Sequence, residues 1–394
     1  MTTCQEPIVI VGAGHSGARA AAALRKHGWT GGISLIGEEQ CLPYDRPPLS
    51  KAVLLGKKTG EQCAFYAESW YAENGIDLLL AQSVDRIDRH SGRVVLQGGR
   101  DLAYHRLLLA TGSSINPLTV PGADLNGVLP LRTPQHAHAI ADSLQSRCRL
   151  VVIGAGVIGL EVAAAALECG CTVTVLERAP QAMGRSVPAI VSEAVVAEHR
   201  RRGVDVQFGV EVAALEGTTK VQAVRLATGE DLPCDIVVYG LGVRPNVSLA
   251  ATAGLSTDNG IRTNQYLQAE DDRIFACGDV CSYDSQLYGR PTRLENWRNA
   301  EDQADTAARN MLGQQVIFDA VPWFWSNQYD FALQVAGLPS LGDQTEMKAI
   351  GRSRLFLSTD ARGVLRGVSA FGSIREIASP IKDFKRVLAT AQRT

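Results

Sequence analysis

Two short apolar runs in this chain are each followed by a glycine-rich turn and an alanine-rich stretch. The first run, Ile8 to Val11, has no polar position, which is typical of a strand buried on both faces of a parallel sheet. After the turn, the stretch ARAAAALRKHG predicts a helix that ends at Gly28, and ISLI at residues 33–36 predicts a second strand. This order of elements indicates a βαβ unit.

The first turn has the glycine spacing of a dinucleotide site. Gly12 permits a tight turn, Gly14 lets the backbone approach a pyrophosphate, and Gly17 lets helix and strand pack closely. The amino end of the helix favours phosphate, and Glu38 after the second strand is placed to accept from ribose hydroxyls. The sequence therefore predicts one bound dinucleotide here.

The second run repeats the same parts. The stretch LVVIG predicts a strand, LEVAAAALECG a helix and TVTVLE a second strand. The predicted dinucleotide-binding residues are Gly154, Gly156, Val157, Ile158, Gly159 and the acid Glu177. Two complete units predict two dinucleotides, and hence redox chemistry between a bound flavin and a nicotinamide.

Two further strands end in short motifs, Ala110-Thr111-Gly112 and Gly278-Asp279. Both resemble motifs of the flavoprotein disulfide-reductase superfamily, where Asp279 would lie on the ribityl chain of FAD. The resemblance implies an α/β fold of glutathione-reductase type, with two Rossmann-like domains and a small α+β C-terminal domain. The first glycine turn then holds tightly bound, non-covalent FAD, and the second holds NADH.

The stretch LPYDRPPLSK, residues 42–51, closely resembles the flavin-side signature of the ferredoxin reductases of bacterial aromatic-ring-hydroxylating dioxygenases (biphenyl, phenylpropionate and tetralin type), to which putidaredoxin reductase is related. By this resemblance Arg46 contacts the FAD pyrophosphate, Lys51 lies at the N5 side of the flavin, and Trp297 and Trp325 lie near the ring. Gly242, in the stretch GVRPNV, belongs to the nicotinamide site and to the return into the FAD domain. Asn327 stands where the resemblance leads us to expect Asp.

The resemblance implies hydride transfer from NADH to N5 of FAD, followed by transfer of single electrons to a Rieske-type [2Fe-2S] ferredoxin. Lys51 and Glu161 are the candidate catalytic residues, because Glu161 is placed to border the nicotinamide and to pair with Lys51. The alternative for Glu161 is a carboxylate in the first helical turn that favours the helix dipole. Glu177 favours NADH over NADPH, although the neighbouring Arg178 leaves some use of NADPH open.

Cysteine content bears on three different functions. The nine cysteines form no Cys-x-x-Cys pair and no cluster at zinc-site spacing, so we expect reduced thiols and no metal site. Cys41, shortly after Glu38, leaves open a thiol-dependent NADH peroxidase or oxidase. A reductase for a Cys-ligated ferredoxin or rubredoxin of a cytochrome P450 or alkane hydroxylase stays open as well, and so does a signalling flavoprotein.

The chain of 394 residues is long enough for several domains. The predicted boundaries are 1–113 and 247–320 for the FAD domain, 114–246 for the NAD domain and 321–394 for the C-terminal domain. A net charge of -2 gives no reason to expect nucleic acid or a membrane as partner, and we expect a cytoplasmic protein.

Two basic stretches have different predicted roles. The tail has a basic helical face formed by Lys382, Lys385, Arg386 and Arg393, which is a candidate docking site for an acidic ferredoxin. The stretch HRRRG, residues 199–203, is expected at the surface of the NAD domain.

Overall fold

The computed structural model describes residues 7–391, which form two compact units. The first unit contains residues 7–45, Cys63–Ser114 and Arg244–Pro322. The second unit contains Arg46–Gln62, Ile115–Val243 and residues 323–391. The chain passes between the units through β8 (Ser113–Ile115) and β17 (Val243–Pro245), and the short helix η2 (Glu61–Cys63) lies at another such passage. The predicted division into three domains stays a prediction.

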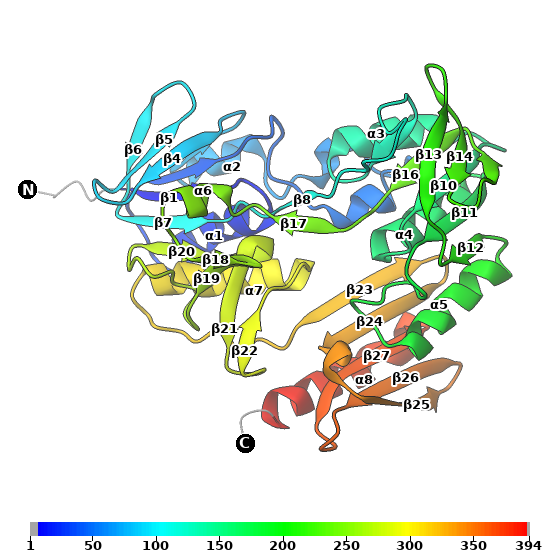
Figure 1. Cartoon of the computed structure of the whole chain (residues 1–394). Coiled ribbons are helices and arrows are strands. Elements are labelled where there is room, and N and C mark those ends of the chain that lie inside the picture. The colour runs from blue at the N-terminus through cyan, green and yellow to red at the C-terminus, as the bar shows by residue number, and fades with distance from the viewer. Residues whose placement is uncertain (1–6, 392–394) are drawn as a thin grey trace, which may run out of the picture. The chain divides into compact units, whose positions relative to one another are not determined.

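The first unit is built on a parallel sheet (Figure 1). The residues of its strands are almost entirely apolar. In spatial order the strands are β20 (Ile274–Ala276), β7 (Arg106–Leu109), β1 (Ile8–Val11), β2 (Ile33–Ile36) and β3 (Ile76–Leu79). Helix α1 (His15–Lys26) packs beside α7 (Trp297–Met311). The predicted strand, turn and helix of the first βαβ unit are confirmed, because the run at residues 8–11 is buried on both faces.

Smaller elements complete the first unit. They are α2 (Glu68–Glu73), α6 (Ser248–Thr252), η3 (Gly278–Val280), the antiparallel sheet of β4 (Val84–Asp88), β5 (Arg93–Leu96) and β6 (Asp101–Ala103), and the sheet of β18 (Thr257–Asp258), β19 (Gly260–Thr263), β21 (Cys281–Ser285) and β22 (Arg290–Thr292).

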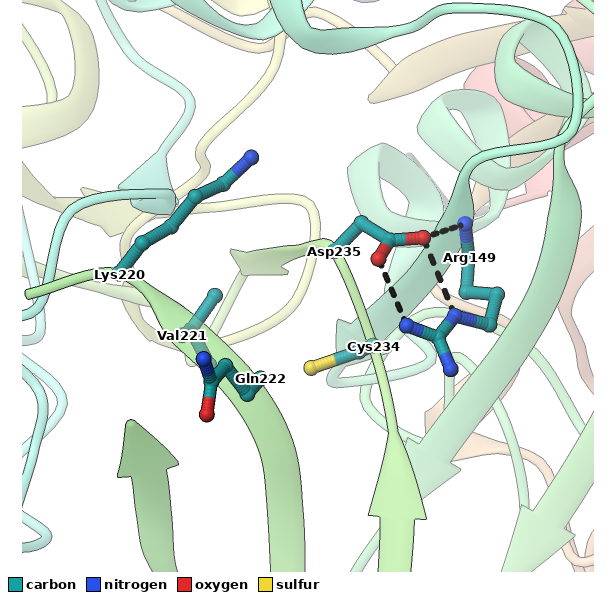
Figure 2. A pocket seen from close by; sticks show the side chains of 6 residues that line it. All are labelled: Arg149, Lys220, Val221, Gln222, Cys234 and Asp235. Carbon is teal, nitrogen blue, oxygen red and sulfur yellow. Dashed lines mark hydrogen bonds and ion pairs between the residues drawn. The ribbon is translucent and has the colours of Figure 1, made fainter. Parts of the chain in front are cut away.

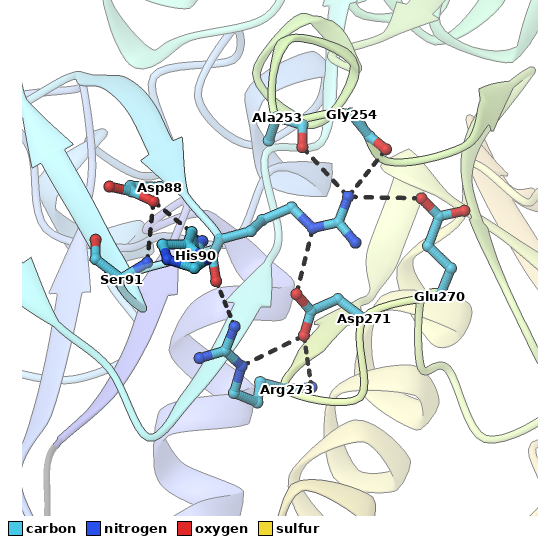
Figure 3. Close-up of polar contacts among 9 residues, drawn as sticks. Asp88, His90, Ser91, Ala253, Gly254, Glu270, Asp271 and Arg273 are labelled. Carbon is cyan, nitrogen blue, oxygen red and sulfur yellow. Dashed lines mark hydrogen bonds and ion pairs between the residues drawn. The ribbon is translucent and has the colours of Figure 1, made fainter.

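A cluster of charged side chains joins distant segments of the first unit (Figure 3). Arg89, after β4, reaches Asp271 with a nitrogen–oxygen distance of 3.2 Å and donates to the carbonyl of Gly254 at 3.0 Å. Arg273 lies 3.5 Å from the other oxygen of Asp271 and also donates to the carbonyl of Arg89. The Asp271 side chain is only 10% exposed, so its charge would be costly without a partner, and the two guanidinium groups compensate it. The cluster thus joins the β4–β5 hairpin to the segment that precedes β20.

The second unit contains a second parallel sheet. Its strands are, in order, β12 (Asp205–Phe208), β11 (Thr172–Glu177), β10 (Arg149–Ile153), β16 (Ile236–Tyr239) and β9 (Val128–Pro130). Its helices are α3 (Pro134–Ser143), α4 (Val157–Glu168) and α5 (Ala189–Arg201), and a small sheet is formed by β13 (Val212–Gly217), β14 (Val221–Leu226) and β15 (Asp231–Pro233). The repeated glycine turn follows β10, as the sequence predicts.

An antiparallel sheet forms the C-terminal part of the second unit (Figure 1). Its strands are, in order, β23 (Trp323–Gln328), β24 (Phe331–Gly337), β27 (Leu365–Gly372), β26 (Ser353–Thr359) and β25 (Gln344–Ile350), with η4 (Pro339–Leu341) and helix α8 (Ile374–Ala391) beside it. Strand β24 is buried along its whole length. Two Rossmann-like sheets and an α+β part confirm the predicted fold class.

Within residues 7–391, no helix combines the length and the apolar character needed to cross a membrane.

Candidate functional site

In the first glycine turn, two of the three glycines have no room for a side chain, and the third borders open space. Gly12 has a φ of +111°, and a Cβ there would collide with the carbonyl of Ala110. A Cβ at Gly17 would collide with the carbonyl of Gly12, so helix and strand pack at the closest possible distance. At Gly14, by contrast, an added Cβ meets nothing within 4 Å, and no side chain caps the helix that starts at His15. Open space beside uncapped N–H groups fits a pyrophosphate.

Two carboxylates, not one, follow β2. Glu38, the predicted ribose acceptor, is exposed. Glu39 is half-buried and accepts hydrogen bonds from the Tyr44 hydroxyl at 2.8 Å and from the Cys41 thiol at 3.7 Å. The sequence interpretation missed Glu39, whose adjacent position is the only signal that the sequence offers for it.

The carboxyl ends of β7 and β20 are neighbours, which brings the two short motifs together. The Ser113 hydroxyl, directly after Gly112, donates to Asp279 at 2.8 Å. The backbone N–H of Gly278 donates to the side-chain oxygen of the fully buried Gln303 at 2.8 Å. Ligands of open α/β sheets bind at the carboxyl ends of the strands, and Asp279 lies at this end of the sheet. Its contact with FAD stays a prediction.

Other predicted flavin residues of the first unit are fixed by backbone and ring contacts. Ala110 is buried, and Thr111 exchanges two hydrogen bonds with Asn246, at 2.8 and 2.9 Å. The indole N–H of Trp297 donates to Asp45 at 2.8 Å, and its ring lies 4.9 Å from that of His15. These contacts hold Trp297 at the start of α7.

The second glycine turn repeats the geometry of the first. Gly154 has a φ of +106°, a Cβ at Gly159 would collide with the carbonyl of Gly154, and a Cβ at Gly156 meets nothing within 4 Å. Helix α4 begins at Val157 without a side-chain cap, and the side chain of Ile158 is 47% exposed. The second turn therefore fits a dinucleotide as well as the first does.

The predicted acid Glu177 is bound to this turn. One carboxylate oxygen accepts from the N–H of Ala155 and the other from the N–H of Ala179, both at 2.8 Å. Gly242 lies in the left-handed region at a φ of +81°, and its carbonyl accepts from the N–H of Asn116 at 3.0 Å. Glu177 is the last residue of β11 and Gly242 follows β16, so both lie at the carboxyl ends of their strands, where ligands of such sheets bind.

Lys51 and Glu161, the predicted catalytic pair, are brought together in the second unit. The Nζ–Oε2 distance is 2.5 Å, and Glu161 is only 5% exposed. The hydroxyls of Ser50 and Ser326 also donate to this carboxylate, the latter at 2.6 Å. The first turn of α4 contains no acidic residue, so the alternative role for Glu161 as a first-turn carboxylate is wrong.

The proline-rich loop holds Lys51 in place. Pro47 and Pro48 start the short 3-10 helix η1 (Pro47–Ser50), which ends next to Lys51. Arg46 donates to the carbonyl of Arg132 at 2.7 Å. The prolines restrict the φ angles of the loop, and the contacts of Arg46 and Lys51 fix its place in the second unit.

The aromatic residues of β23 are half-buried. The rings of Trp323 and Trp325 stack at 4.9 Å with an interplanar angle of 24°. Asn327 is exposed on the same strand. A flavin contact for Trp325 stays a prediction.

The expectation that residues 199–203 lie at the surface is wrong for His199, which is fully buried. Its Nε2 lies 2.6 Å from the side-chain oxygen of Gln328, and its Nδ1 lies 3.1 Å from the Tyr329 hydroxyl. Arg200 and Arg201 are exposed as expected. The sequence gives no sign of this burial, because His199 stands beside arginines and its partners Gln328 and Tyr329 lie far along the chain, at the end of β23 and directly after it.

Burial lowers the pKa of His199, and we expect this to make the stability depend on pH. The unfolded chain takes up the proton near pH 6.5, but the folded chain resists it, so stability present above that pH is lost as the pH falls. The slope is at most about 1.4 kcal/mol per pH unit. The urea concentration at the unfolding midpoint should decrease less between pH 7.5 and 5.5 in His199→Gln than in the wild type. Equal losses in both proteins would contradict this.

The cysteines near the predicted cofactor motifs are poor nucleophiles. Burial raises the pKa of Cys281 to about 12 and that of Cys277 still further. Cys41, by contrast, is half-buried. Among the described residues, no group of His, Cys, Asp and Glu is arranged to hold a metal ion.

An open pocket in the second unit does not belong to the dinucleotide site (Figure 2). Its lining includes Arg149 and Asp235, which form a bidentate pair, with Lys220 and Cys234 beside them. Arg149 and Asp235 lie at the amino ends of β10 and β16. Nucleotides bind at the opposite ends of such strands, so this pocket is not a candidate cofactor site.

The basic tail forms part of helix α8. Lys382 and Arg386 are exposed, and Arg386 lies 3.8 Å from Asp383. Arg393 lies outside the described residues. The face is thus less positive than its lysines and arginines alone suggest.

Comparisons with family models cover almost the whole chain. Residues 6–304 match the family described as pyridine nucleotide-disulphide oxidoreductase. Residues 323–392 match a reductase C-terminal domain.

Individual relatives and solved structures agree with these matches. The chain is 41% identical to rhodocoxin reductase from Rhodococcus erythropolis over 85% of its length and 79% of that protein. It is 39% identical to the anthranilate 1,2-dioxygenase system ferredoxin–NAD(+) reductase component from Burkholderia cepacia, over 98% and 93%. The reductase in a covalent putidaredoxin reductase–putidaredoxin complex superimposes with a TM-score of 0.94 at 36% identity, covering 98% of this chain and 94% of that one.

Proposed function

Because the chain belongs to the pyridine nucleotide-disulphide oxidoreductase family, we propose that it is an FAD-dependent NADH:ferredoxin oxidoreductase. The relatives confirm the predicted resemblance to ferredoxin reductases, the enzyme class and the use of FAD and NAD(H). The predicted electron transfer from NADH to a ferredoxin is supported by the same relatives. The observation that carries the proposal is the presence of two separate glycine turns with the same geometry. In each, the middle glycine borders open space at the start of a helix that no side chain caps.

Each turn has its own cofactor in this proposal. The turn at Gly14, with Asp279 and Trp297, would hold FAD, and the turn at Gly156, with Glu177, would hold NADH. Bound FAD accepts electrons in pairs as hydride and gives them up singly, which matches a two-electron donor to a one-electron acceptor. Lys51, fixed by Glu161, would present a positive charge to the flavin, and orientation supplies most of the catalysis.

The acceptor in this proposal is a Rieske-type [2Fe-2S] ferredoxin of an aromatic-ring dioxygenase. The relative from Burkholderia cepacia, named for a dioxygenase system, favours this type. Rhodocoxin reductase and putidaredoxin reductase keep a Cys-ligated ferredoxin as the alternative. We place docking at the basic face of α8 and the protein in the cytoplasm, where NADH is supplied.

Anaerobic stopped-flow re-oxidation of the NADH-reduced protein tests the acceptor. One sample receives a Rieske-type ferredoxin and the other a Cys-ligated ferredoxin of accessible potential, since cluster potentials span several hundred millivolts. Fast transfer only to the Rieske protein supports the proposal, and fast transfer only to the other shifts it to the alternative. If neither is reduced, the ferredoxin-reductase function is wrong. Cys41→Ser should turn over like the wild type, because the proposed electron transfer uses no thiol. A thiol-dependent peroxidase would instead lose all activity on this substitution.

Replacement of Glu177 by Ala is expected to weaken NADH binding about tenfold, because both carboxylate oxygens and the fixed position of Ala155 are lost. Glu177→Gln keeps one acceptor but removes the charge, so it should bind NADPH better than the wild type does. The NADH concentration dependence of flavin reduction measures both. Unchanged affinity in Glu177→Ala would remove Glu177 from the nicotinamide site.

A further inference from the structure

A continuous chain of hydrogen bonds leads away from the Lys51–Glu161 pair. Ser326 donates to Oε1 of Glu161 at 2.6 Å. The side-chain nitrogen of Gln328 donates to the Ser326 hydroxyl at 3.0 Å, and the oxygen of the same amide lies 2.6 Å from Nε2 of His199. The Tyr329 hydroxyl completes the chain at Nδ1 of His199, at 3.1 Å.

The inner members of this chain are out of contact with water. Ser326 and His199 are 0% exposed and Gln328 is 2% exposed. The inner members come from α5 (His199) and β23 (Ser326 and Gln328), and the Glu161 that they lead to lies on α4. A buried polar group without a partner is costly, so each member restricts the orientation of the next.

The direction of the chain follows from the carboxylate. Glu161 only accepts, so the single hydroxyl proton of Ser326 must point to it, and Ser326 must accept from the nitrogen of Gln328. The amide oxygen of Gln328 then faces His199, which must carry its proton on Nε2. Burial lowers the pKa of His199, so the ring is neutral at pH 7 and its Nδ1 carries no proton. The Tyr329 hydroxyl, whose pKa burial raises to about 12, therefore donates to Nδ1. Every donor in the chain therefore points toward Glu161.

We propose that Ser326, Gln328 and His199 are positioning residues that fix the Glu161 carboxylate and, through it, the Lys51 ammonium group. The proposal rests on the proposed function only in giving Lys51 a role beside the flavin. Ser326 holds Oε1, which leaves Oε2 to Ser50 and Lys51. Without the Ser326 donor, the carboxylate is free to rotate, and Lys51 loses its fixed place.

Strand β27 offers a matched control for the removal of the Ser326 hydroxyl. Ser369 is also 0% exposed and lies in the same C-terminal sheet, and its hydroxyl has no partner among the described residues. Ser326→Ala and Ser369→Ala thus remove the same atom from similar surroundings. We expect both to fold and to retain FAD.

Flavin reduction by NADH, without any ferredoxin, is the first measurement. Ser326→Ala should lower the rate constant about tenfold, and Ser369→Ala less than about twofold. In a Glu161→Ala background, Ser326→Ala should change the rate less than about twofold, because the acceptor that it serves is already absent. A full tenfold effect in that background, or an equal effect of both serine variants, would overturn the proposal.

Imidazole ¹⁵N NMR provides a readout that is independent of turnover. The His199 resonances, assigned by their loss in His199→Gln, should show the neutral Nε2–H tautomer in the wild type at pH 7. Gln328→Met, which removes the acceptor, should shift the tautomer distribution. A wild-type Nδ1–H tautomer would contradict the direction of the chain.

A donor at position 199 should rescue the rate. The side-chain amide of His199→Gln can replace the Nε2–H donor, whereas His199→Met offers none, so flavin reduction should be faster in the former variant. Equal rates would show that His199 only fills space. Failure of ferredoxin reduction would instead affect the proposed function, because none of these measurements uses a ferredoxin.

Discussion

Gly17→Ala is expected to lose its FAD and at least about 4 kcal/mol of stability. The added Cβ would collide with the backbone carbonyl of Gly12, and α1 would have to move away from β1. No flexible side chain is available to yield, since the contact is with the main chain. Thermal unfolding and the flavin absorbance of the purified protein measure the two losses.

Gly14→Ala separates cofactor binding from folding. Its φ of -80° suits any residue, and the new Cβ meets nothing within 4 Å, so the apoprotein should unfold at the wild-type temperature. FAD affinity should nevertheless fall about tenfold or more, because the methyl group occupies the space that the pyrophosphate needs. Wild-type FAD affinity in Gly14→Ala would mean that no phosphate approaches this turn.

Glu161→Gln is expected to slow flavin reduction by NADH about 100-fold, with little change in folding. The amide keeps the size of the side chain but removes the charge that holds Lys51 at 2.5 Å. Because Glu161 is nearly buried, its pair with Lys51 is weakly screened by solvent, so the loss of the charge is felt. Single-turnover stopped flow gives the rate.

Helix α4 provides the matched control. Glu168 pairs with Lys57 at 2.7 Å, but both side chains are more than half exposed, at 52% and 61%. Such surface pairs contribute little, so Glu168→Gln should reduce its flavin at the wild-type rate. If both variants were equally slow, the effect would come from the helix and not from the buried pair.

The sequence predicted the parts of the site that are determined locally. The roles of Gly12, Gly14 and Gly17 depend on backbone geometry within one turn, and the structure has that geometry at both copies. The pairing of Lys51 with Glu161 was predicted through a family resemblance and lies outside what local pattern alone reveals.

The residues missed were those whose role depends on distant partners. Ser326 and Gln328 lie in an aromatic strand whose polar positions resemble ordinary solvent-facing ones. His199 lies among arginines, so its sequence context indicated a solvated helix end. Only the packing of α5 and β23 within the second unit shows that these side chains share one buried network.

The order of strands in the first unit has a consequence for synthesis on the ribosome. Strand β20, Asp279 and α7 complete the sheet that begins with β1, and Asp271 and Arg273 tie the returning segment to Arg89. The parallel sheet of the second unit, by contrast, is contiguous from Val128 to Tyr239. As the chain emerges from its amino end, the inserted sheet can close while β7 still awaits its neighbour β20. The first parallel sheet to be started is therefore the later one to be completed, and Asp279, the proposed FAD contact, is added only after its last strand.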